Sequence, residues 1–236
     1  MNAAEVDRAL TESETALAQG GAVDLARTGF WRAVSAAKRD RSIIEPYGER
    51  IARIDRVAFE RRVWLRIPAP IGVALDVTGT GAGILLIAIA SGRPTPGTET
   101  PFWALAPWRE MVFLLGVAAI MGATHTLAHW LVGSVSGIRF THWFAMPTRP
   151  QPGFKIDYAS YLRTPARGRA WMHASGAIVT KIIPFAAYPV ALLAGLEPWA
   201  PWLLLGLGVV QLITDATLST RYSDWKKFRR EMRFAR

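Results

Sequence analysis

Residues 123–130 read Ala-Thr-His-Thr-Leu-Ala-His-Trp and lie within the apolar run 110–133, which is long enough to form a membrane-spanning helix. Positions i and i+4 of an α-helix share one face, so His125 and His129 can point toward the same metal ion or haem edge. Burying polar side chains in hydrocarbon is costly, and an intramembrane histidine is therefore a candidate functional residue. The alternative is that both neutral rings hydrogen-bond to serine, threonine or backbone groups of neighbouring helices.

The composition indicates a polytopic membrane protein. Of the 236 residues, 51% are hydrophobic and only 19% are charged, and the hydrophobic residues are gathered in blocks. The chain has no cysteine, which excludes disulfides, thiolate metal sites and cysteine nucleophiles. Any bound metal ion would then be held by histidine and carboxylate side chains.

Four apolar segments predict transmembrane helices at about 68–91, 110–134, 166–194 and 200–218. We therefore expect an all-α integral membrane protein, with these helices in a domain of residues 67–220. In the first segment Gly79 and Gly83 are four residues apart, which lets a neighbouring helix approach closely. After the second segment, alternating residues at 138–145 and 154–161 flank prolines and a glycine and predict a short β-hairpin.

The two ends of the chain are polar. Residues 1–66 are predicted to be a soluble helical segment with helices at 3–19, 23–39 and 47–67, and residues 221–236 to be a basic tail. Lysine and arginine crowd both ends and the loop 138–169, whereas the loop 92–109 has only Arg93 and Arg109. The positive-inside rule therefore predicts a multi-pass protein with both termini in the cytoplasm.

The formal net charge of +10 raises the question of a nucleic-acid partner. The basic residues stand beside apolar segments, where anionic lipid headgroups are the nearer partner. We therefore expect the lipid bilayer, and not nucleic acid, to be the partner of these charges.

Several polar residues fall at a similar depth in the predicted helices. Counted inward from the cytoplasmic ends, Asp76, His129 and Asp215 lie at one level, with Lys181 similar, His125 a turn deeper and His173 shallower. Helices that each deliver a polar group to one depth are typical of a buried site in a bundle.

The segment from His125 to Gly133, followed by the Gly-Ile-Arg-Phe sequence at 137–140, resembles the first motif of the site-2 proteases, which are intramembrane zinc metalloproteases. The resemblance implies that His125 and His129 bind zinc, that Asp215 is the third ligand, and that the hairpin lies beside the active site. The small residues 174–177 are similar to another stretch of the family, without its proline. Thr126 stands where the family has its catalytic glutamate, and a threonine cannot act as the general base.

The sequence therefore predicts a membrane-embedded zinc protein that resembles the site-2 protease core but is non-proteolytic or altered in hydrolytic activity, with a transmembrane peptide or a protein as its partner. Asp76 is the candidate replacement base. The first alternative is a b-type cytochrome, in which His125 or His129 and His173 are the axial ligands of haem b. The second is a structural or assembly protein of the membrane. For Asp215 the alternative to metal binding is an ion pair with Lys181 or a helix-cap hydrogen bond.

Overall fold

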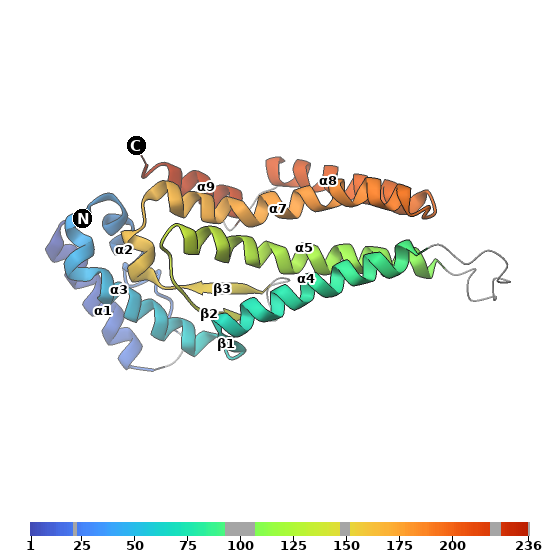
Figure 1. Ribbon diagram of the computed structural model, residues 1–236. Helices are drawn as coiled ribbons and strands as arrows, with labels where there is room; N and C mark the ends of the chain where they lie inside the picture. The colour runs from blue at the N-terminus through green and yellow to red at the C-terminus, as the bar shows by residue number, and fades with distance from the viewer. Residues whose placement is uncertain (21–22, 93–106, 147–151, 218–222, 236) are drawn as a thin grey trace, which may run out of the picture. The chain divides into compact units, whose positions relative to one another are not determined.

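The computed structural model describes residues 1–20, 23–92, 107–146, 152–217 and 223–235 (Figure 1). Its internal contacts divide the chain into two compact units. Unit 1 consists of Met1–Gly72, Trp130–Met172 and Phe228–Arg236, and unit 2 consists of Val73–His129 and His173–Lys227. The described residues form nine helices and one three-stranded antiparallel sheet, which confirms the expectation of a mainly helical chain with a small β element.

Three helices near the N-terminus build the core of unit 1: α1 (Ala3–Ala18), α2 (Phe30–Arg39) and α3 (Arg41–Arg62). A capping box between Asn2 and Glu5 begins α1. The apolar faces of the three helices, with α6 (Tyr158–Arg163), enclose a cluster of buried side chains that includes Val6, Leu10, Phe30, Ile51, Ile54 and Leu162.

Two of the predicted N-terminal helices have different bounds in the structure. The helix predicted at 23–39 begins only at Phe30, because Gly29 has a φ of 76°, a left-handed conformation that interrupts the helix. The helix predicted at 47–67 begins at Arg41, where the side chain of Asp40 caps it. Pro46 lies inside this helix, near its start, and costs it one backbone hydrogen bond without ending it.

The predicted hairpin is confirmed as β2 (Phe140–Phe144) and β3 (Gly153–Ile156), which pair antiparallel. A strand that the sequence did not predict, β1 (Arg66–Pro68), pairs with the other edge of β2. The second strand is shorter than the predicted 154–161, because Asp157 accepts a hydrogen bond from the backbone of Ser160 and thereby caps α6.

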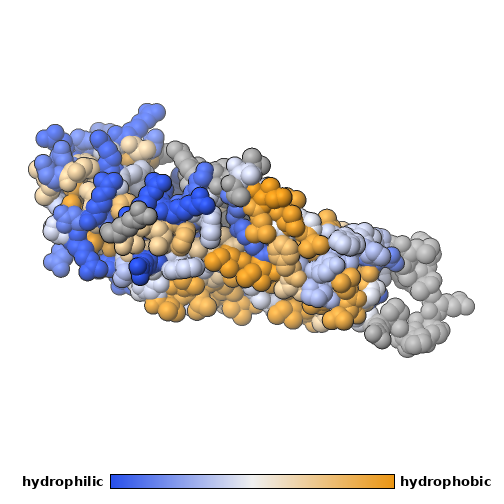
Figure 2. Space-filling model, turned by 90° about the horizontal axis from the view of Figure 1, so that it is seen from above, coloured by the Kyte–Doolittle hydropathy of each residue, from blue (hydrophilic) through white to orange (hydrophobic). Residues whose placement is uncertain are grey.

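Three helices are long and apolar enough to cross a membrane: α4 (Ala69–Ser91), α5 (Trp108–Val135) and α7 (Ala166–Leu193). Their bounds agree closely with the first three predicted segments. α8 (Trp199–Thr217) is also apolar but shorter. Hydrophobic residues cover much of the visible surface of the apolar helices (Figure 2), and several large ones are strongly exposed, as is Leu85 at 61%. An apolar surface of this kind is typical of helices in contact with lipid.

In unit 2, α4 and α5 touch through their backbones. A Cβ added at Gly83 would lie 2.7 Å from the carbonyl oxygen of Gly116, and one added at Gly116 would lie equally close to the carbonyl of Gly83. The close approach that the glycine spacing predicted is thus confirmed. Arg109 donates hydrogen bonds to the carbonyls of Ala90 and Ala194, which joins the start of α5 to the ends of α4 and α7.

The C-terminal residues predicted as a tail contain helix α9 (Asp224–Met232). In unit 1 its fully buried Glu231 forms ion pairs with Lys38 of α2 and, at 2.8 Å, with Arg169 of α7. Burial alone would raise the pKa of Glu231, but the charges and hydrogen bonds of Lys38 and Arg169 outweigh it and hold the pKa below its usual value. This ionised carboxylate therefore stabilises unit 1.

Replacing Glu231 by Gln should leave Lys38 and Arg169 buried without a counter-charge and lower the free energy of unfolding at neutral pH by about 3–5 kcal/mol. Because the pKa of Glu231 is lowered on folding, its contribution is present above about 4.5 and is lost as the pH falls through the folded value. The difference between the two proteins should thus shrink in acid. Denaturant titration in detergent at several pH values measures it, with exposed Glu45→Gln as the control; a difference independent of pH would contradict the prediction.

Candidate metal centre

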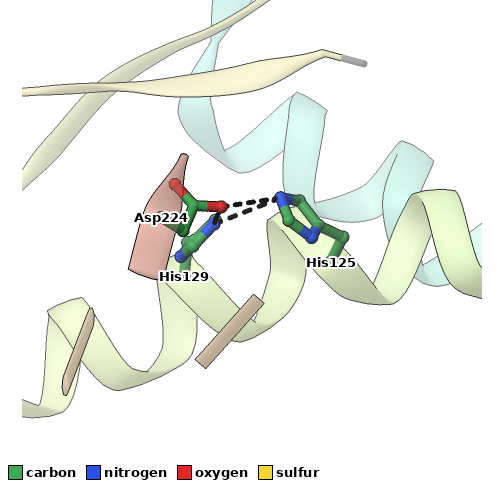
Figure 3. A group of neighbouring side chains, drawn as sticks. All are labelled: His125, His129 and Asp224. Atoms are coloured by element: carbon green, nitrogen blue, oxygen red, sulfur yellow. Dashed lines mark hydrogen bonds and ion pairs between the residues drawn. The ribbon is translucent and has the colours of Figure 1, made fainter. Parts of the chain in front are cut away.

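Two imidazoles and one carboxylate converge in unit 2 (Figure 3). His125 and His129 project from consecutive turns of α5, and Asp224 is the first residue of α9. The two Nε2 atoms are 3.3 Å apart, and Asp224 Oδ2 lies 3.3 Å from His129 Nε2 and 3.4 Å from His125 Nε2. All three side chains are largely buried, with 14–17% of each exposed.

These separations fit a single metal ion. Nitrogen and oxygen ligands lie about 2.0–2.2 Å from zinc, and in a tetrahedral arrangement such ligands are roughly 3.3–3.5 Å apart. The observed triangle of 3.3, 3.3 and 3.4 Å has these dimensions. A shared proton would satisfy only two of the three donor atoms, whereas a divalent ion accepts a lone pair from each.

Thr180 of α7 contacts the ring of His125. Its hydroxyl donates a hydrogen bond to the carbonyl of Gly176 at 2.8 Å and lies 2.8 Å from His125 Nδ1. When the hydroxyl proton is donated to this carbonyl, the threonine oxygen accepts from the Nδ1–H group of His125. The Nε2 atom of His125 is then unprotonated and can bind a metal ion, as in many histidine metal sites with an outer hydrogen bond.

Gly176 of α7 makes room for the second histidine. A Cβ at this position would lie 2.4 Å from His129 Nε2 and 2.9 Å from the carbonyl oxygen of His125. Any other residue would therefore displace the ring of His129 or separate α7 from α5. Gly176 belongs to the stretch of small residues noted in the sequence, although that signal did not reveal its contact with the histidine.

Asp224 is positioned by its own helix. It occupies the N-terminal end of α9, where the helix dipole favours a negative charge, and Lys227 lies 2.8 Å from its Oδ1 atom. Burial opposes ionisation, but the interactions with His129 and Lys227 outweigh it and hold the pKa of Asp224 well below its usual value. The carboxylate is therefore available in its charged form.

Asp215, which we expected as the third ligand, does not belong to this group. Its carboxylate forms an ion pair with Lys181, which is the alternative considered from the sequence. The physical reason is the ammonium group of Lys181, which lies on an apolar helix and needs a counter-charge. Asp224 was not predicted as a ligand, because it lies in the segment 221–236 that was predicted to be a basic tail.

Of the other polar residues singled out in the sequence, Thr126 and Asp76 contact each other, whereas His173 lies outside the converging group. Thr126 is buried and donates a hydrogen bond to Asp76 of α4, with 2.6 Å between the hydroxyl and the carboxylate oxygen. A carboxylate from another helix is thus placed against the residue that follows His125. In the described residues of unit 2, His173 is not a member of the converging group, and its role as a haem ligand stays a prediction.

Replacing Gly176 by Ala should force the added methyl group against His129 and lower the free energy of unfolding by about 1–3 kcal/mol, the usual cost of overpacking. Gly206→Ala is the matched control, because a Cβ at Gly206 of α8 meets nothing within 4 Å. Thermal unfolding of the two purified variants measures the effect. Equal melting temperatures would show that the tight contact between Gly176 and His129 is not present.

Comparison with known proteins assigns no family to the chain. No protein-family model, curated protein or solved structure matches it. The resemblance to the site-2 proteases therefore rests on the residues around His125 and His129 alone.

Proposed function

We propose that the protein is a membrane-embedded zinc-binding protein similar to the site-2 protease core, in which His125, His129 and Asp224 hold the ion. The observation that carries this proposal is the triangle of donor atoms at the spacing of tetrahedral zinc ligands. Imidazole and carboxylate donors suit zinc, and the arrangement of Thr180 and Gly176 supports two correctly placed imidazoles.

The proposal includes a membrane topology. α4, α5 and α7 are the first three transmembrane helices, and α8, with 19 residues and a length of roughly 28 Å, is the fourth. Both termini are then on the cytoplasmic side, where the basic residues are concentrated. The partner in this proposal is a transmembrane peptide or a membrane protein that binds beside the zinc site.

One contact favours retained but altered hydrolytic chemistry as a second candidate function. Bound zinc supplies a Lewis acid that lowers the pKa of a coordinated water, and the family uses a glutamate as the proton acceptor. Here Asp76 contacts the side chain at that position, Thr126, through a buried hydrogen bond of 2.6 Å. In this second candidate function, Asp76 is therefore the proton acceptor in place of the missing glutamate.

Metal analysis of the purified full chain tests the centre. His125→Ala, His129→Ala and Asp224→Ala should each lower zinc content sharply, because the remaining two ligands neither neutralise nor fully coordinate a buried ion. Asp215→Ala is the matched control and should retain the zinc of the parent protein, since Asp215 pairs with Lys181.

Other results of the metal analysis would favour another ligand set or another function. Zinc lost in Asp215→Ala but retained in Asp224→Ala would restore the ligand set expected from the sequence. A visible haem band that disappears in His173→Ala would replace the zinc site by the b-type cytochrome. Neither zinc nor haem in a protein purified without chelators would favour the structural or assembly role.

Thr126→Glu tests the placement of Asp76. The new glutamate would meet the carboxylate of Asp76 in a buried site, where two neighbouring carboxylates cannot both ionise, so this variant should unfold at a lower temperature than the parent. The exchanged pair Asp76→Thr with Thr126→Glu restores one carboxylate and one hydroxyl, and we expect it to recover most of the lost stability. If Thr126→Glu and the exchanged variant have the same melting temperature, Asp76 does not contact the side chain at position 126. Asp76→Thr alone is the control.

A further inference from the structure

Six exposed arginines gather in unit 1 around α9. They come from the junction of α2 and α3, from the start of α7 and from α9 with the residue after it: Arg39, Arg41, Arg167, Arg229, Arg230 and Arg233. We call them the arginine cluster. The carboxylates nearest to them in the sequence are already used, since Glu231 pairs with Lys38 and Arg169 and Asp40 caps α3. Among the described residues, no carboxylate forms an ion pair with a member of the cluster.

The cluster lines neighbouring hollows that share lining residues. One hollow of about 480 Å³ is lined by Ser35, Arg39, Arg230, Arg233 and Phe234. Another of about 340 Å³ shares Arg39 and Phe234 with it and includes Arg41 and Arg167. Guanidinium groups that face a shared hollow can form paired hydrogen bonds to the oxygens of a phosphate group.

The surroundings of the cluster are unusually positive. Burial lowers the pKa of Lys38, and the charges of Arg169 and Arg230 lower it further although Glu231 opposes them. Among the described residues, the buried carboxylate of Glu231 pairs with both Lys38 and Arg169, while the arginine cluster around them adds six positive charges. The missing counter-charge would come from an anionic ligand.

Apolar surface adjoins the arginines. A third hollow, of about 600 Å³, is lined by Arg167, Arg229 and Arg233 together with Phe228, Met232 and Ala235. The ring of Phe228 contacts Trp171, which is 52% exposed on the early turns of α7. α7 continues from there as a helix of membrane-spanning length, so the cluster stands where a membrane interface is expected.

We propose that the arginine cluster binds the headgroup of an anionic phospholipid, whose acyl chains lie along Phe228, Met232 and Trp171. The arginines supply the phosphate contacts, and the apolar side chains beside them supply a surface for the chains. A nucleic acid or a free phosphate would use the arginines but leave this apolar surface uncovered. None of the three hollows is lined by His125, His129 or Asp224, and the proposal does not rest on the zinc assignment.

Native mass spectrometry of the full chain in a neutral detergent tests the proposal, with phosphatidylglycerol and phosphatidylcholine of identical acyl chains as probes. Phosphatidylglycerol should bind more tightly. Arg39→Gln combined with Arg233→Gln should weaken its binding roughly 25-fold, at roughly fivefold for each arginine, and leave phosphatidylcholine binding unchanged. The matched control is Arg8→Gln with Arg32→Gln, two exposed arginines of α1 and α2 outside the hollows, which should bind phosphatidylglycerol like the parent.

Three results would overturn the proposal. Equal binding of the two lipids would show that the headgroup charge is not recognised, and equal weakening in both double variants would show that only total charge matters. Competition by inorganic phosphate or by a short single-stranded oligonucleotide, at concentrations as low as those at which phosphatidylglycerol binds, would show that the acyl chains contribute nothing. Phosphatidylcholine binding reports whether each variant is still folded.

Discussion

The convergence of two imidazole nitrogens and a carboxylate oxygen at 3.3–3.4 Å is the interaction on which the proposed metal centre depends. Donor atoms this close repel one another unless a cation or protons lie between them, so the surrounding chain has to hold them in place. Thr180 directs the ring of His125, Gly176 leaves space for the ring of His129, and the first turn of α9 presents Asp224. Thr180, Gly176 and Asp224 are all distant in sequence from the histidines that they contact.

Several acidic residues of the described chain form ion pairs with lysine or arginine. Lys155 with Asp55, and Lys38 and Arg169 with Glu231, bring cations and carboxylates out of water together, and Lys181 pairs with the more exposed Asp215. A carboxylate that neutralises a lysine in an apolar environment is not available to a metal ion, since removing it would leave an uncompensated buried charge. α9 combines the two uses of a carboxylate, because it begins with Asp224 and carries Glu231 one residue before its end.

The contact between Thr126 and Asp76 has a different role in each of the two candidate functions. If the centre only holds a metal ion, a buried aspartate beside it is a structural hydrogen-bond acceptor for a threonine. If the centre retains hydrolytic chemistry, the same aspartate supplies the carboxylate that α5 lacks, now from α4. The close backbone contact of Gly83 with Gly116 brings these two helices together and is compatible with either view.

The sequence by itself determined the features that depend on neighbouring residues. The three long apolar helices follow from continuous hydropathy, the hairpin from alternation around turn residues, and the shared face of His125 and His129 from their spacing of one helical turn. Only the tertiary structure decided the third member of the centre, the strand β1 and the role of Gly176. The resemblance implied Asp215 as the third ligand, whereas in the structure Asp215 pairs with Lys181 and Asp224 lies beside the two histidines.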